Sequence, residues 1–383
     1  MFIGGQNDGE SVFGEKQYDG ALMLNLKEIF SGKKSLVGLD IGSSSLKLAE
    51  IISTSRGYLL NRFLQVPLPK GIISDGVLAD SNALSLKIKE LFRHSGCRSK
   101  GIVTSLAGNS VIIKKVTLEQ MNENELRDLI HDEAGKYLPF DNMDDVNYDF
   151  QILGDNSYNP NQMDIIIVAA KKDVVNSYLE AVTAAGLNVM IMDVAPFVLE
   201  SMYEANYEFD NEEMAVIINI GASTTGINVL KGGTSIFTRD FTLAGNSITE
   251  SLQEKYKVTF EEAEKLKIEG IPDGSDGDNL DLKNSILDFA QPLCMEIERS
   301  IDYFRSTYGG EYIKQVLLSG GSANIYNLAK NLSEKLNVKT ELINPFLKIS
   351  YNKRHIDVKN LESIKPIAAT AIGLGLRKMG DKK

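Results

Sequence analysis

Two stretches of this 383-residue chain follow one pattern: an apolar strand, a polar residue, the pair Ile-Gly, a turn of small residues and a returning strand. The first is Leu36–Glu50, where the polar residue is Asp40, and the second is Ala215–Val229, where it is Asn219. Each stretch reads as two short strands joined by a tight turn. A pattern that occurs twice predicts a duplicated α/β domain with one polar turn in each half.

The first turn has the chemistry of a phosphate clamp. Glycine and serine let the backbone approach an anion closely, and consecutive N–H groups converge on its oxygens. A lysine after the turn adds positive charge, and an aspartate before it is placed to hold the waters around Mg²⁺. An ordinary hairpin is the alternative, because short glycine motifs also match by chance. The residues of the predicted clamp are Asp40, Gly42, Ser43, Ser44, Ser45 and Lys47.

A third glycine-containing loop follows the second hairpin along the chain. The stretch Val316–Asn324 reads as a strand that runs into Gly320 and Gly321 and then into a helix. Adjacent glycines let the backbone lie flat against a base or a sugar. We therefore expect this loop to contribute to the same ligand site as the two turns.

Composition limits the compartment and the ligand classes. A formal net charge of −11 argues against binding along a nucleic acid, which proteins engage with clustered Lys and Arg. The two cysteines, Cys97 and Cys294, lie far apart and suit a reducing cytoplasm better than a disulfide framework. No apolar run approaches the roughly 20 residues of a membrane helix, and the first residues lack the apolar core of a secretory signal. We predict a cytoplasmic protein without a transmembrane span.

Hydrophobic periodicity predicts a small inserted subdomain. An amphipathic helix at residues 122–138 precedes two strands, Val146–Leu153 and Asp164–Ala170. Before them, Ile102–Leu106 and Val111–Val116 are expected to form a hairpin through the short loop Ala-Gly-Asn.

The remaining helices include two with a structural role. Leu280–Tyr308 reads as one long helix bent at Pro292. Ile364–Met379 is rich in Ala and Gly, which predicts close packing against the crossover helix that begins near Asp193 and a hinge between lobes. Residues 1–34 contain a short apolar helical stripe, for which docking on the body or on a partner is favoured over membrane binding.

The three loops, in this order and spacing, resemble the two phosphate loops and the adenosine loop of the actin, sugar kinase and Hsp70 superfamily. Further stretches are similar to the PilM family, the cytoplasmic actin-like proteins of type IV pilus assembly, to which FtsA is related. The resemblance covers about Leu36 to Lys378. The stretches are Glu133-Ala-Gly-Lys-Tyr-Leu-Pro-Phe140, Ala185-Gly-Leu, Gly245-Asn-Ser-Ile-Thr-Glu, Glu296-Ile-Glu-Arg-Ser-Ile-Asp-Tyr-Phe304 and Ala371-Ile-Gly-Leu-Gly-Leu-Arg377.

The resemblance implies an α/β, actin-like (ribonuclease H-like) duplicated two-lobe ATPase fold with an FtsA/PilM-type small subdomain. The expected division is a leader at 1–34, a first lobe at 35–200 that includes the subdomain at about 117–171, a second lobe at 201–363, and a C-terminal helix at 364–383 that returns to the first lobe. It also implies ATP and Mg²⁺ as ligands.

The implied partner is the cytoplasmic N-terminal tail of PilN, held in a groove between the first lobe and the small subdomain. The protein would then lie at the inner membrane through its partners and serve pilus assembly and twitching motility. Other pilus platform proteins, motor ATPases and self-association are further contacts that this resemblance suggests.

The resemblance also assigns roles to individual residues. Asp40 would organise Mg²⁺, and the first turn with Lys47 would hold phosphates. The second turn would hold them from the other side through Gly221, Ala222, Ser223, Thr224 and Thr225. The ribose and the base would be approached by Gly245, Glu250, Glu296 and Arg299, and the adenosine would be closed over by Gly320, Gly321 and Ser322.

One departure from the superfamily pattern concerns hydrolysis. Most ATP-hydrolysing members begin the second phosphate loop with Asp, whereas this chain has Asn219. An amide can bind a metal-bound water, but it has no charge and accepts no proton at neutral pH. We expect ATP binding with little turnover and name no catalytic residue.

Two other functions share this fold. A small-metabolite kinase needs a carboxylate base beside an alcohol pocket, for which Asp193 is a candidate, although a strand-end role fits it better. An FtsA-like cell-division scaffold is expected to end in a linker and an amphipathic helix, whereas this sequence ends at Arg377-Lys-Met-Gly-Asp-Lys-Lys383.

Overall fold

The structure is a computed structural model that describes residues 36–74, 76–156, 159–271, 279–308, 312–356 and 358–380. The leader helix expected within residues 1–34 lies outside these ranges. None of the helices in the described ranges combines the length and the apolar character that crossing a membrane requires.

Five strands follow one order in both large sheets, and the first sheet has a sixth strand at its edge. In each, a hairpin is extended by a third antiparallel strand on one side and by two parallel strands on the other, which confirms the predicted duplication. The first sheet has the order β10-β6-β1-β2-β3-β16, built from β1 (Val37–Ile41), β2 (Ser45–Thr54), β3 (Gly57–Pro67), β6 (Gly101–Leu106), β10 (Asn188–Val194) and β16 (Ser350–Tyr351). The second has the order β13-β12-β11-β14-β15, built from β11 (Met214–Ile220), β12 (Thr225–Lys231), β13 (Thr234–Phe241), β14 (Ile313–Ser319) and β15 (Thr340–Leu342).

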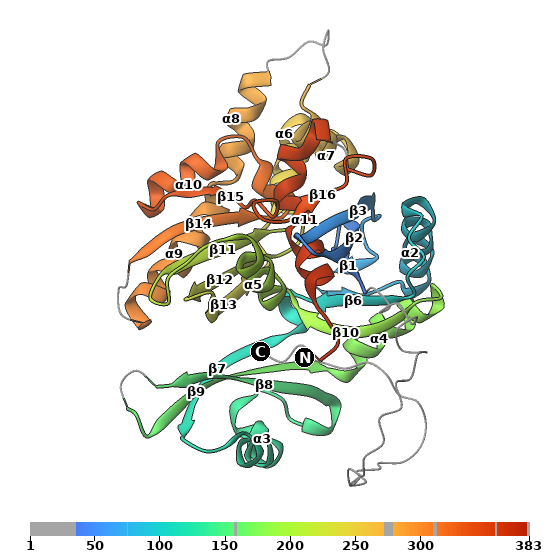
Figure 1. The fold of residues 1–383 in the computed structure, drawn as a ribbon. Coiled ribbons are helices and arrows are strands. Elements are labelled where there is room, and N and C mark those ends of the chain that lie inside the picture. The colour runs from blue at the N-terminus through green and yellow to red at the C-terminus, as the bar shows by residue number, and fades with distance from the viewer. Residues whose placement is uncertain are drawn as a thin grey trace.

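Two helices, α5 (Ala195–Asn206) and α11 (Leu361–Leu376), lie between the two sheets (Figure 1). They form one apolar core with Ile51 of the first sheet and with Ile217 and Leu317 of the second. Because both sheets pack on the same pair of helices, the lobes are joined through α5 and α11.

Glycines allow this central packing to be close. A methyl group on Gly38 of β1 would collide with the α11 backbone at Ala371. A methyl group on Gly373 of α11 would collide with the α5 backbone at Val198. The predicted packing of the small-residue helix on the crossover helix is confirmed, although this helix begins at Leu361 rather than Ile364.

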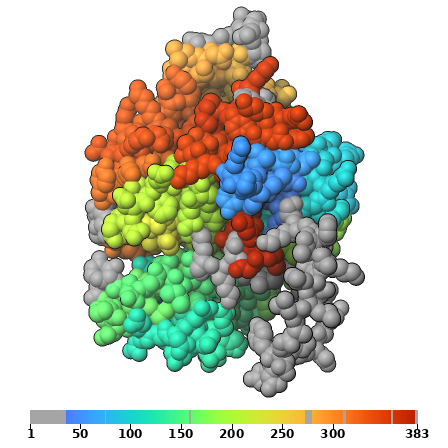
Figure 2. All heavy atoms as spheres, in the orientation of Figure 1, coloured from blue at the N-terminus to red at the C-terminus, as the bar shows by residue number. Residues whose placement is uncertain are grey.

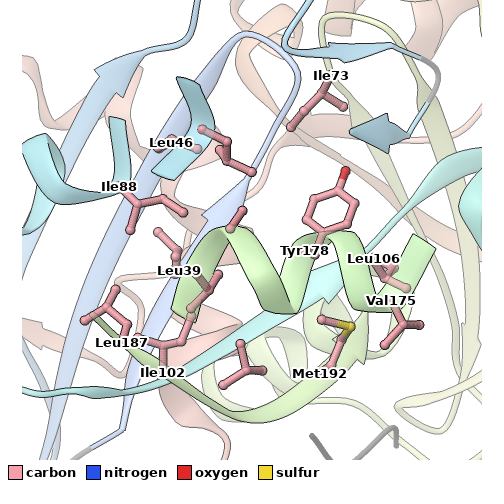
Figure 3. Packing of buried hydrophobic residues seen from close by; sticks show 14 of the residues in the cluster. Leu39, Leu46, Ile73, Ile88, Ile102, Leu106, Val175, Tyr178, Leu187 and Met192 are labelled. Carbon is pink, nitrogen blue, oxygen red and sulfur yellow. The ribbon is translucent and has the colours of Figure 1, made fainter. Parts of the chain in front are cut away.

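Further helices cover the outer face of each sheet. On the first sheet, α2 (Ser81–Ser95) and α4 (Lys172–Ala184) share one apolar cluster with the strands, and Figure 3 shows Leu39, Ile88 and Tyr178 among its residues. Asp80 caps α2 by accepting a hydrogen bond from the Ala83 N–H at 2.9 Å, as its position predicts. The second sheet is covered by α6 (Gly245–Tyr256), α7 (Phe260–Glu269), α8 (Asn279–Phe289), α9 (Gln291–Tyr308) and α10 (Leu328–Leu336).

A third sheet forms the small subdomain. It has the strand order β7-β9-β8 and one covering helix, and it makes up the lower end of the molecule below the second lobe in Figure 2. In its central strand, Ile165 and Ile167 pack against the helix, whereas Ile166 and Val168 join the core of the first lobe. The subdomain is therefore fixed to the first lobe through one face. Its elements are β7 (Ile112–Glu119), α3 (Glu123–Tyr137), β8 (Val146–Asp155) and β9 (Gln162–Lys171).

Two predictions about local connections are wrong. β6 and β7 do not form a hairpin, because β6 pairs in the large first sheet and β7 in the subdomain sheet. The expected single helix at 280–308 divides at Ala290 into α8 and α9. Pro292 explains the break, since it has no N–H to donate and its ring collides with the preceding turn.

Candidate functional site

The carboxyl-terminal edges of the two large sheets face each other. In the first sheet β1, β6 and β10 run parallel, and Leu106 at the end of β6 lies opposite Val194 at the end of β10. The residues just beyond this edge line a small pocket together with the second turn. That pocket is lined by, among others, Ala107, Ala195, Asn219 and Thr224. The edge from which the first turn projects therefore meets the edge that carries the second.

The first turn is tight, and the ammonium group of Lys47 lies close to its backbone. The Gly42 N–H donates to the Ser45 carbonyl at 3.1 Å, which closes the turn. Lys47 Nζ lies 2.9 Å from Asp40 Oδ2, and both side chains are largely buried. A methyl group on Gly42 would lie 3.3 Å from the same Nζ atom. The charge of Lys47 is thus directly under the backbone that was predicted to bind phosphate.

The three serines of this turn differ in their surroundings. Ser43 is half-buried and Ser44 is exposed, so both remain accessible at the tip. Ser45 is buried, and its hydroxyl accepts a hydrogen bond from Gln65 at 3.0 Å. The Ser45 side chain is therefore occupied within β2 and β3, and its role in the turn lies in its backbone.

The second turn, the third loop and the start of α6 converge on Gly221. The Gly221 N–H donates to the Thr224 carbonyl at 2.9 Å. The Gly221 carbonyl accepts hydrogen bonds from the Ser322 hydroxyl at 2.9 Å and from the Gly245 N–H at 3.1 Å. These three predicted segments, far apart in the sequence, form one hydrogen-bonded unit.

The second turn is further fixed by its neighbours. Asn246 donates from its backbone to the Ala222 carbonyl at 2.7 Å and from its side chain to the Ser223 hydroxyl at 3.2 Å. Thr225 is fully buried, and its hydroxyl donates to Leu243. The accessible part of this turn is consequently Ala222 to Thr224.

The two glycines of the third loop have different environments. Gly320 has φ +89°, a conformation that favours glycine, and a methyl group there would collide with the Ile220 carbonyl. A methyl group on Gly321 would meet nothing within 4 Å. The loop thus has a fixed base at Gly320 and open space beside Gly321. Asn219 points toward this base, since its Oδ1 would lie 2.8 Å from a methyl group on Gly320.

Two residues of α7 that sequence reasoning missed belong to this region. Lys267 donates to the Gly245 carbonyl at 3.1 Å and to the Thr249 hydroxyl at 2.6 Å, and it pairs with Glu264 at 2.7 Å. Burial lowers the pKa of Lys267, and the Glu264 carboxylate opposes this shift. The sequence signal that identifies Lys267 is its position in the helix. It follows the fully buried Ala263 by one helical turn and therefore lies on the inward-facing side of α7.

The other predicted ribose and base residues have different partners. Glu250 forms an ion pair with Lys70 of the first lobe at 3.4 Å, and Lys70 also lies 3.9 Å from the ring centre of Phe260. Glu296 pairs with Arg239 on the edge strand β13 at 2.8 Å and with Arg299 at 2.9 Å. Gly245 therefore contacts the second turn, whereas Glu296 pairs with an arginine of β13 and with Arg299 on its own helix.

Asp193, the candidate base of a kinase, is enclosed. Its carboxylate lies 2.8 Å from Arg377 Nε, and both side chains are at most 9% exposed. Burial raises the pKa of Asp193, and the Arg377 charge opposes that rise. This carboxylate therefore has an ion-pair role at the junction of β10, α5 and α11. No group of three or more His, Cys, Asp or Glu with metal-binding geometry occurs in the described parts of the chain.

Two lobes of matching topology, joined by two packed helices and carrying turns at facing edges, define the actin-like fold. A family model for the type IV pilus assembly protein PilM matches residues 38–379, so the chain belongs to the PilM family. A solved structure of a PilM-PilN type IV pilus biogenesis complex contains a chain that is 28% identical, with a TM-score of 0.80 over 90% of this chain and 99% of that one. The ethanolamine utilization protein EutJ from Carboxydothermus hydrogenoformans shares the fold at 15% identity, with a TM-score of 0.53 and 89% of each chain covered. The family inferred from the sequence is confirmed.

Proposed function

We propose that the chain binds ATP with Mg²⁺ between its two lobes and acts as a nucleotide-responsive adaptor in type IV pilus assembly. The observation that carries this proposal is the meeting of the two sheet edges, with one glycine turn on each. Space beside Gly321 and the hydrogen-bonded unit around Gly221 support a nucleotide at this position. The domain division at residues 35–200 and 201–363 is part of the proposal.

The residues present fit the proposed ligand. Backbone N–H groups at Ser43, Ser44 and residues 222–224 would bind phosphate oxygens, with Lys47 supplying charge. Asp40 would hold waters of the Mg²⁺ shell. Bound Mg²⁺ would neutralise phosphate charge, and Lys267 would keep the α6 backbone at Gly245 in place beside the sugar. The neutral amide of Asn219 favours binding over hydrolysis, because it accepts no proton at neutral pH.

The proposed partner is the cytoplasmic N-terminal tail of PilN. Family membership and the similarity to a chain of the PilM-PilN complex support this choice. The tail would bind between the first lobe and the small subdomain and so bring the protein to the inner membrane from the cytoplasm. Platform proteins, motor ATPases and further copies of the chain are additional proposed contacts, and pilus-dependent twitching motility is the proposed cellular role.

A peptide of the PilN tail, titrated into the purified chain with and without Mg²⁺-ATP, tests the proposal. A nucleotide-responsive adaptor has two states that differ in tail affinity, so the dissociation constant should change at least about fivefold. Phosphate release should stay well below about 1 per second, the lower range of ordinary enzymes. Equal tail affinity in both conditions, or turnover at ordinary enzyme rates, contradicts the proposal.

A small-metabolite kinase of the same fold is a weaker alternative. It requires an accessible carboxylate base, whereas the Asp193 carboxylate is buried in its pair with Arg377. A thermal-shift screen of sugars with ATP discriminates the two, because a large shift with one sugar favours a kinase.

A further inference from the structure

The turn between β6 and β7 connects the first lobe to the small subdomain. It comprises Ala107 and a short 3₁₀ helix, Gly108–Ser110, and the Ser110 hydroxyl donates to the Ala107 carbonyl at 2.7 Å. Gly108 has φ +64°, a conformation that favours glycine. β6 belongs to the large sheet and β7 to the subdomain sheet. Because β7 begins two residues after the turn ends, a displacement of the turn moves the first strand of the subdomain.

This connecting turn also contacts the second lobe at Gly108. A methyl group on Gly108 would lie 3.0 Å from Cγ2 of Thr224, in the second turn. The Gly108 N–H donates a hydrogen bond to the carboxylate of Asp240 on β13. Gly226 leaves room for this carboxylate, since a methyl group there would lie 2.7 Å from Asp240 Oδ1. One glycine of the first lobe is thus held by the second turn and by the edge strand beside it.

A second contact joins the same subdomain strand to the second lobe. Lys115 of β7 lies 5.8 Å from the ring centre of Tyr308, at the end of α9. Lys115 also pairs with Asp164 of β9 at 2.8 Å, which fixes its position within the subdomain sheet. β7 therefore contacts the second lobe both where it begins and near its middle.

We propose that the connecting turn at Gly108, held by Asp240 and Thr224, transmits the nucleotide state of the second turn to the small subdomain. This inference rests on the proposed function, because it requires a nucleotide in the cleft and a partner that reads the subdomain. A ligand that draws the second turn toward the first displaces Thr224 and β13 together. Gly108 follows through its contact and hydrogen bond, and β7 changes its angle to the first lobe.

Hydrogen exchange and peptide titration test this proposal in the full chain. Mg²⁺-ATP should change amide exchange in residues 112–119 of the wild type, and it should alter PilN-tail affinity at least about fivefold. Asp240→Ala, which removes the acceptor, should bring both responses close to zero, while ATP affinity stays within about twofold. Asp240→Asn, which keeps an acceptor for the Gly108 N–H, should retain them. Asp302→Asn on α9 is the matched control and should behave as the wild type.

The outcomes separate this inference from the function beneath it. Coupling that persists in Asp240→Ala overturns the role of the connecting turn and leaves the adaptor function intact. Absence of ATP binding, or equal tail affinity with and without ATP in the wild type, overturns both. If the tail peptide does not bind, the exchange response of residues 112–119 still decides the role of the turn. If Asp240→Ala does not fold, Thr224→Ser, which removes the methyl group that contacts Gly108, replaces it, and an undiminished response in that variant overturns the inference.

Discussion

Substitution of Arg377 by Met should strongly destabilise the chain. Arg377 Nε lies 2.8 Å from Asp193 Oδ2, and the side chains are 9% and 4% exposed. Removing one partner leaves the other charge buried and unpaired, which costs about 3–5 kcal/mol. Thermal unfolding should shift by about 1.2 °C per kcal/mol in a chain of 383 residues, so the expected loss is about 4–6 °C at pH 7.

The double variant Asp193→Asn with Arg377→Met separates the pair from simple packing loss. It removes both charges and keeps similar side-chain volumes, so most of the lost stability should return. Urea and thermal unfolding of the wild type, both single variants and the double variant give the coupling energy. A loss below about 1 kcal/mol in Arg377→Met, or a double variant no more stable than it, would refute this reasoning.

Three further predictions concern the cleft and its surroundings. Gly321→Ala should change the free energy of unfolding by less than about 0.5 kcal/mol and should weaken ATP binding measured by calorimetry. Gly320→Ala should destabilise the fold by about 1–3 kcal/mol, because only the methyl group at Gly320 collides with backbone. Equal effects of the two variants on stability would contradict this prediction. Burial raises the pKa of Asp240 to about 6 from its usual value near 3.8. The protonated carboxyl therefore stabilises the fold fully below pH 3.8, and this stabilisation is lost as the pH rises through 6. The stability of Asp240→Asn relative to the wild type should therefore increase by about 2 kcal/mol between pH 4.5 and 8 in urea unfolding, and a constant difference would disprove it. Lys70→Ala should raise the nucleotide dissociation rate up to about fivefold at low salt, because the exposed ion pair with Glu250 contributes about 1 kcal/mol or less. An unchanged rate of nucleotide release, measured by stopped flow at low salt, would count against this prediction.

The sequence predicted the features that depend on local chemistry. Both hairpins were found because an apolar strand, a small-residue turn and a returning strand are encoded within fifteen consecutive residues. The Asp80 cap is also encoded locally, since its partner Ala83 lies three residues away. Duplication of the fold followed from the repeat, because two similar hairpins require two similar sheets.

Features that depend on distant partners were missed. The ion pair between Glu250 and Lys70 was not predicted, because Lys70 is 180 positions away and belongs to the other lobe. The loop after β6 has the composition of a hairpin loop, but its two strands pair in different sheets. Lys267 was missed because a buried lysine has no local signature apart from its helical position. Each case required knowledge of which segments are neighbours in space.

A calorimetric titration of Mg²⁺-ATP, with variants in both turns, tests the central claim most directly. If the turns bind one triphosphate together, the wild type should bind one ATP per chain. Lys47→Ala, which removes a positive charge from the first turn, and Ser223→Asp, which places a carboxylate beside the phosphate oxygens at the second, should each weaken binding about tenfold, the equivalent of about 1.4 kcal/mol. Their effects should also be non-additive in the double variant, because both act on the same ligand. Absence of ATP binding, or a variant in either turn that binds as the wild type does, would contradict the account.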